Sequence, residues 1–135
     1  MTNFESICAQ FAAILKGKST VNQGSCSVSL HRNFTVSVQG RKSTSVLPAG
    51  VVFESLDPRG HALNLAEIAL LQEEIPAFMS SVVQQNLIVS ALHNHWLFMN
   101  PQIMYIHIQS VESPISFAEK MARAFSYLRS WLVAE

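Results

Sequence analysis

Charged residues are scarce in this sequence. They make up 13% of its 135 residues, against about a quarter in a typical soluble domain. Lys plus Arg equals Asp plus Glu at nine each, and basic residues form no run, so the long-range field that gathers phosphates is missing. We therefore expect no nucleic acid partner. The large apolar share predicts surface buried against another subunit, that is, a homo-oligomer.

Long apolar runs are also missing. No stretch approaches the roughly 20 residues that are needed to cross a bilayer. The N-terminal segment through Lys16 carries Glu5 and spaces its apolar residues as a helix does, unlike the continuous apolar core of a signal peptide. We therefore expect a mature N-terminal helix, no membrane partner and a cytoplasmic location.

Cysteine occurs only twice, at Cys8 and Cys26. The two form no close-spaced ligand pair and no disulfide framework, and Cys8 falls on the apolar stripe of the N-terminal helix. This usage predicts reduced thiols, in keeping with a cytoplasmic protein.

The length of the chain suits one domain that spans residues 1–135, because two cores would each be too small. Thr2 and Glu5 have the spacing of a capping box, and Gly17 follows Lys16 as a C′ glycine, which bounds a first helix. Short alternating or β-branched runs, separated by turn residues, then predict strands over 26–31, 34–38 and 51–56.

The second half alternates strands and helices. A strand is expected over 61–71, and Glu73 and Glu74 then stand in the first turn of a helix. Strands over about 87–96 and 102–109 form a hairpin around Asn100. Ser113 is the N-cap of a last helix. Its apolar stripe is formed by Phe117, Met121, Phe125, Leu128 and Leu132.

These elements predict an α+β fold, with helices packed on a mixed β-sheet. Its C-terminal half is expected to be a ferredoxin-like βαββα unit, preceded by the N-terminal helix and short strands.

Three histidines carry the main chemical signal. His93 and His95 are two residues apart in a strand, so they point to one face with Cα atoms about 7 Å apart. His107 lies on the polar face of the returning strand. A hairpin centred near Asn100 would put His93 opposite His107, whereas a register slip of one residue would separate them.

Three such histidines resemble zinc sites that keep a fourth position open for water. A crossover from the 61–71 strand through the next helix would bring Glu73 or Glu74 to the same edge of the sheet, as fourth ligand or general base. The plainer interpretation is that the glutamates favour the helix dipole and that the histidines are ordinary polar residues.

Other motifs fit less well. Gly17-Lys18-Ser19-Thr20 copies the end of a phosphate-binding loop, but the earlier glycine is replaced by Ala12 and a helix precedes it instead of a strand. A histidine pair of this spacing also occurs in cupins, where a glutamate soon follows. The residues after His95 supply none, and a cupin is kept only as an alternative.

From about Gly60 to Leu128 the chain resembles the LppY/LpqO-type bacterial domain family, and the N-terminal half is similar more faintly. The motif strings are Glu74-Ile75-Pro76, Ser90-Ala91-Leu92-His93-Asn94-His95, Pro101 and Tyr105-Ile106-His107. The resemblance implies that His93, His95, His107 and Glu74, rather than Glu73, are the motif positions. It implies no activity. Where the family has a glycine and an aspartate after the third histidine, this chain has Ser110-Val111-Glu112-Ser113.

The sequence thus suggests a small protein that binds a divalent metal ion, preferably zinc, through His93, His95 and His107, with Glu74 as fourth ligand or acid/base. If the chain is an enzyme, metal-assisted hydrolysis is the reaction to test. The alternative is a non-catalytic domain that binds a small molecule or a second copy of itself.

Overall fold

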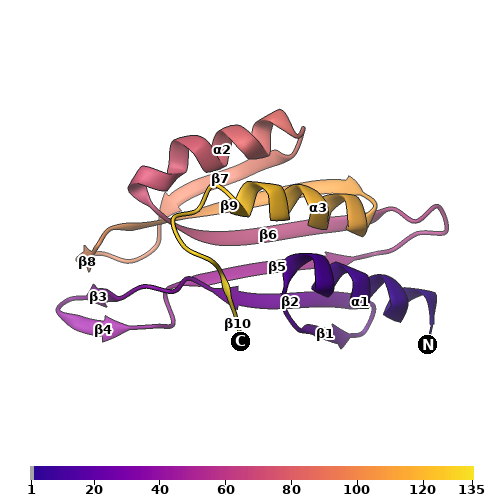
Figure 1. The fold of residues 1–135 in the computed structure, drawn as a ribbon, viewed down its shortest axis with the longest axis horizontal. Coiled ribbons are helices and arrows are strands. Elements are labelled where there is room, and N and C mark those ends of the chain that lie inside the picture. Colours follow the sequence, from indigo (N-terminus) through magenta and orange to yellow (C-terminus); the bar gives the residue numbers. More distant parts are fainter. Residues whose placement is uncertain (1) are drawn as a thin grey trace.

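The computed structural model describes residues 2–135 and has three α-helices in this part of the chain (Figure 1). The helices are α1 (Asn3–Leu15), α2 (Ile75–Gln84), which follows the short 3-10 turn η1 (Gln72–Glu74), and α3 (Pro114–Phe125). The first strands are β1 (Ser19–Asn22), β2 (Ser25–His31), β3 (Val36–Val38), β4 (Arg41–Ser43) and β5 (Pro48–Glu54). The remaining strands are β6 (Ala62–Leu71), β7 (Ile88–Asn94), β8 (Met99–Asn100), β9 (Ile103–Glu112) and β10 (Val133–Ala134).

The main sheet has seven strands in the order β1-β2-β5-β6-β9-β7, with β10 also paired to β2. A small second sheet has the order β4-β3-β8. The α+β class is confirmed. One detail differs, because each strand pair formed by residues 2–135 is antiparallel and the sheet is therefore not mixed.

The C-terminal half has the predicted strand-helix-strand-strand-helix order. Strands β6 and β7 run parallel to each other, but β9 lies between them and pairs antiparallel with both. This is the split βαβ arrangement of ferredoxin-like units. It places the C-terminal ends of β6 and β7, and hence the start of α2 and His93, at the same edge of the sheet. The strand expected to reach residue 96 ends at Asn94, so His95 lies beyond it.

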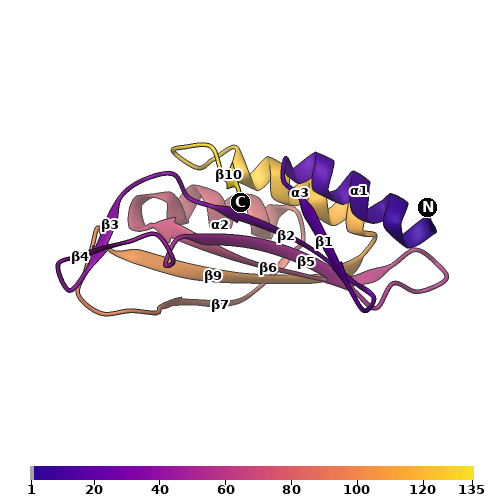
Figure 2. The same cartoon turned by 90° about the horizontal axis from the view of Figure 1, so that it is seen from below.

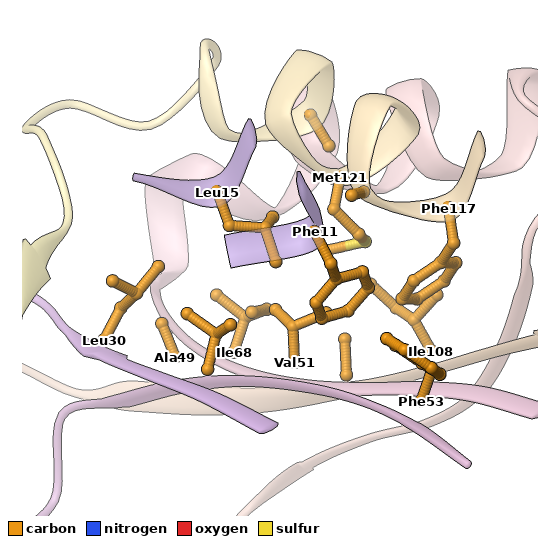
Figure 3. Close-up of a cluster of buried hydrophobic side chains, with 14 of the residues drawn as sticks. Phe11, Leu15, Leu30, Ala49, Val51, Phe53, Ile68, Ile108, Phe117 and Met121 are labelled. Carbon is orange, nitrogen blue, oxygen red and sulfur yellow. The ribbon is translucent and has the colours of Figure 1, made fainter. Parts of the chain in front are cut away.

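All three α-helices lie on one side of the main sheet, and the other side faces away from them (Figure 2). The core lies between these layers. Figure 3 shows Phe11 of α1 and Phe117 and Met121 of α3 directed towards strand residues such as Val51 and Ile108. Burial of this apolar surface is the main source of stability in such a two-layer fold.

The cap at the start of α1 is confirmed, since the Thr2 hydroxyl accepts a hydrogen bond from the Glu5 amide at 3.0 Å. At the other end, the left-handed residue is Lys16, with φ 60°, and not Gly17. Gly17 is needed for another reason. A Cβ at this position would come within 2.5 Å of Val28 Cγ1, so the glycine allows close contact between the chain and β2.

The expectation of reduced cysteines is wrong. Cys8 and Cys26 form a disulfide that joins α1 to β2, and both are buried in the core. The bond could not be predicted from the spacing of the cysteines, because they are 18 positions apart and meet only when α1 packs on the sheet. The cytoplasmic expectation rested partly on reduced thiols and loses that support.

The C-terminal segment also departs from the prediction. The N-cap Ser113 is confirmed, but α3 ends at Phe125, so Leu128 and Leu132 lie beyond the helix. The chain then returns to pair β10 with β2. Trp131 in this segment is 81% exposed, and the Lys16 ammonium group lies over its ring, 5.1 Å from the centroid.

Candidate functional site on the open face of the sheet

The face of the sheet that turns away from the helices is buried at one end, where residues such as Tyr105 pack with the small sheet of β3 and β8, and is open elsewhere. Along β6 the buried positions alternate with Leu63, Leu65 and Glu67, which are partly or largely exposed. On β9 the same alternation puts Ile106 in the core and His107 on the open face. This period of two is what the strand sequences predicted.

His93 and His107 meet on this face. Their Nε2 atoms are 3.0 Å apart and their ring centroids 5.0 Å apart. The predicted register is wrong by two residues, since His93 lies opposite Tyr105 and His107 lies opposite Ala91. A shift of two keeps every side chain on its face, so the two imidazoles still meet as diagonal neighbours.

The backbone fixes the tautomer of His93. Its Nδ1 lies 2.6 Å from the Asn94 carbonyl oxygen, and a carbonyl can only accept a hydrogen bond. In the neutral ring the Nδ1 proton is therefore donated to Asn94, and Nε2 presents its lone pair to His107. A ring held in this way by a backbone carbonyl is the usual arrangement of a histidine that binds a metal ion.

His95 stands beside this pair without joining it. Its ring centroid is 6.1 Å from that of His93, and the ring is stacked on Trp96 at 4.1 Å. The predicted proximity of His93 and His95 is thus present, while the imidazole of His95 faces the indole.

Glu67 of β6 is a site residue that sequence reasoning missed. Its register partner is His107, and its Oε1 lies 3.9 Å from His107 Nε2. Both side chains remain partly exposed, at 43% and 34%. The available signal was the single acidic residue in the mainly apolar run of β6, on the face opposite to Asn64.

Glu74 is not brought to the histidines. Its oxygens accept hydrogen bonds from Arg32 Nη1 and Nη2, both at 2.7 Å, and from the amides of Leu71 and Arg129, both at 2.8 Å. These four bonds occupy the four acceptor positions of a carboxylate. Glu73 forms an exposed ion pair with Arg129 at 2.7 Å.

The ion pair determines the protonation of Glu74. Burial raises the pKa of its carboxyl group, but hydrogen bonds from Arg32, Arg129 and Leu71, together with the charge of Arg32, outweigh this and hold the pKa below its ordinary value of 4.5. Glu74 is therefore an ionised structural group at neutral pH.

A shallow groove of about 430 Å³ continues from the histidine pair across the open face. Its lining follows the register, because Glu67 on β6 pairs with Gly50 on β5, and Gly50 pairs with Ser29 on β2. The next row runs through Leu65 and other residues of the same strands. The groove therefore crosses the strands and has His107 and Glu67 at one end.

Within residues 2–135, no three His, Cys, Asp or Glu side chains are gathered closely enough, as they stand, to hold a metal ion. No helix in this part of the chain is long and apolar enough to cross a membrane.

Together, these features define an α+β domain with a histidine pair and a groove on the open part of one sheet face. The sequence matches the family described as "Domain of Unknown Function (DUF1259)" over residues 9–127, and the protein belongs to this family. The similarity to an uncharacterised domain family, which the histidine motifs indicated, is thereby confirmed. No curated protein and no solved structure matches the chain.

Proposed function

We propose that this protein binds a divalent metal ion, preferably zinc, through His93 and His107, with Glu67 and His95 completing the site. The observation that carries the proposal is the 3.0 Å approach of the two Nε2 atoms on an exposed polar face. Sequence reasoning assigned Glu74 to this role, but its four hydrogen bonds make Glu67 the better carboxylate.

The geometry of the pair suits a tetrahedral ion. Zinc–nitrogen bonds of 2.0–2.1 Å put two nitrogen ligands about 3.3 Å apart, close to the observed separation. The Glu67 carboxylate, 3.9 Å from His107 Nε2, would need only a small rotation to become a third ligand. Side-chain rotation of His95 away from Trp96 would supply a fourth.

If the site is catalytic, the reaction to test is metal-assisted hydrolysis. A zinc ion lowers the pKa of its bound water to near 7 and so generates a nucleophile at neutral pH. With His93, His107 and Glu67 as ligands and His95 left on Trp96, one position of a tetrahedral ion would stay open for this water. The exposure of Glu67 gives substrate and water access to the site.

The test is elemental analysis of the untagged protein after zinc loading and desalting. We expect near-stoichiometric zinc in the wild type and loss of more than nine tenths of it in a His93→Ala/His107→Ala variant. The matched control is His61→Ala, because His61 is exposed in the loop before β6, away from the pair. Zinc-free wild type, or a His93→Ala/His107→Ala variant that keeps its zinc, would contradict the proposal.

The two glutamates are distinguished by a second comparison. Glu67→Gln should weaken zinc binding at least ten-fold without changing stability, because Glu67 is partly exposed and makes no buried bond. Glu74→Gln should lower stability and leave the zinc affinity of the folded protein unchanged. The reverse pattern would restore Glu74 as the ligand.

A non-catalytic binding domain is the second candidate. The uncovered sheet face and its groove favour it, since a small molecule or a second copy of the chain could cover this surface. In that case the histidine pair would bind its ligand by hydrogen bonds, and zinc would not be retained.

We also propose that the chain is of the LppY/LpqO type, which the Ala-Leu-His-Asn-His string supports. A cytoplasmic location was expected from the sequence, whereas the Cys8–Cys26 disulfide favours an oxidising compartment.

A further inference from the structure

The residues that line the groove beside the histidine pair indicate which class of ligand it can bind. Its charged or titratable lining groups are Glu67 and His107, and its lining residues include no Lys or Arg. A negatively charged group lying along the groove would therefore meet no Lys or Arg side chain and would be repelled by the Glu67 carboxylate. The part of a ligand that lies along the groove is therefore expected to be uncharged.

The floor of the groove is mainly apolar. Val52 and Leu65, which are cross-strand partners, form its centre, and Leu65 is 37% exposed. Polar side chains border this centre at both ends, Ser27 and Ser29 on β2 far from the histidines and Ser90 and Gln109 near them. An apolar strip of this kind covers aliphatic carbon and offers it no charged partner.

Gly50 keeps the groove continuous. It lies between Ser29 and Glu67 in one cross-strand row, and a Cβ added there would meet no atom within 4 Å. A larger residue could be accommodated by the backbone, since Gly50 is not among the residues with positive φ. The absence of a side chain at Gly50 thus opens the row between Glu67 and Ser29, and the whole row from His107 to Ser29 spans three strand spacings, about 14 Å.

We propose that this groove holds the aliphatic chain of a neutral acyl ligand whose carbonyl end reaches His93 and His107. The inference rests on the proposed metal function for the head group, because a carbonyl oxygen at the histidines would be bound and polarised by the zinc ion. The chain itself is bound by the apolar strip alone, so the two parts can be tested separately.

The first test measures chain-length dependence. Zinc-loaded protein is titrated by calorimetry with acetohydroxamic acid and with octanohydroxamic acid, which carry the same zinc-binding head. A fully buried methylene tightens binding about four-fold, and in a groove open on one side about two-fold is expected, so the longer compound should bind about fifty-fold more tightly. Equal affinity of the two compounds would overturn the proposal.

Two variants locate the effect. Gly50→Trp fills the path and should abolish the chain-length gain while leaving acetohydroxamic acid binding unchanged. Val111→Trp is the matched control, since Val111 is on the same open face, is 73% exposed and does not line the groove. The chain-length gain should persist in it. A gain that survives Gly50→Trp would show that the chain lies elsewhere.

A second measurement does not depend on metal. Octanamide, which is neutral, is added to metal-free protein while amide chemical shifts are followed, and shifts confined to the rows of Gly50 and Leu65 are expected. If octanamide causes these shifts but the protein binds no zinc, the proposal for the groove stands and the proposal for the metal site is rejected. Absence of these shifts would overturn the proposal. A dimer in sedimentation that Gly50→Trp dissociates would show instead that a second copy of the chain covers the groove.

Discussion

Arg32 and Glu74, which are 42 residues apart, form a bidentate ion pair in which both nitrogen–oxygen distances are 2.7 Å. Both side chains are almost fully buried, at 0% and 1% exposure. The pair joins the chain after β2 to the start of α2, and Glu74 also holds the backbone of Arg129 beyond α3. A site residue expected from sequence is therefore part of the structural framework.

Loss of the Glu74 charge should destabilise the protein strongly. Glu74→Gln leaves Arg32 as a buried cation without its counter-ion, and we expect a loss of about 3 kcal/mol in the free energy of unfolding, measured with urea. An Arg32→Met/Glu74→Leu double variant should recover part of this loss, because it removes both charges together. Glu73→Gln is the control. Its ion pair is exposed and should contribute little; an equal loss in this control would contradict the prediction.

Acid should weaken the fold through two carboxylates. Glu74 has a lowered pKa for the reasons given above. The pKa of Glu112 is also lowered, because hydrogen bonds from Lys120, Ser110 and Ser116 outweigh its partial burial. A carboxyl group whose pKa is lower in the folded state stabilises the fold above its unfolded pKa, and this stabilisation is lost as the pH falls through the folded value.

Stability should therefore be constant near neutral pH and fall as the pH drops below about 4.5. The measurement is urea unfolding at a series of pH values. A Glu74→Gln/Glu112→Gln variant should show a shallower decline in this range than the wild type. The same slope in both proteins would mean that other carboxyl groups dominate.

Reduction of the Cys8–Cys26 disulfide should destabilise the protein without changing its fold. The bond closes a loop with a sequence separation of 18, and loops of that size contribute about 3 kcal/mol by restricting the unfolded chain. Thermal unfolding of Cys8→Ser/Cys26→Ser beside the wild type, with and without reductant, measures this. Reductant should lower the melting temperature of the wild type alone. Free thiols in the denatured, untreated wild type would show that the bond does not form.

Tyr105 should remain protonated to unusually high pH. Burial, aided by the negative charge of Glu67, raises its pKa to about 12, and its hydroxyl donates to the Val46 carbonyl at 2.6 Å. Because the folded pKa lies above the ordinary value of 10.0, the stability that it contributes is present below pH 10 and is lost as the pH rises towards 12.

Tyr105→Phe should accordingly cost about 2 kcal/mol at neutral pH, since it leaves the Val46 carbonyl without its partner. Spectroscopic titration is the second readout. The tyrosinate absorbance that distinguishes wild type from Tyr105→Phe should develop near pH 12 and not near pH 10. Ionisation near pH 10 in folded protein would contradict the buried hydrogen bond.

The amino-acid sequence by itself determined the order of the main elements and the face on which each strand residue lies. Both follow from local periodicity, because a strand alternates its side chains whatever it pairs with. His93 and His107 could thus be assigned to one face, although their register was predicted two residues away. The caps at Thr2 and Ser113 are local in the same sense, since each hydroxyl bonds an amide three residues further on.

The tertiary structure decided which distant groups meet. Glu67 faces His107 because β6 pairs with β9, and Glu74 binds Arg32 because the fold brings the segment before α2 beside the residue that follows β2. The Cys8–Cys26 bond likewise depends on α1 lying over β2. These partnerships span 18 to 42 residues along the chain and arise from burial and close packing, which no short-range pattern encodes.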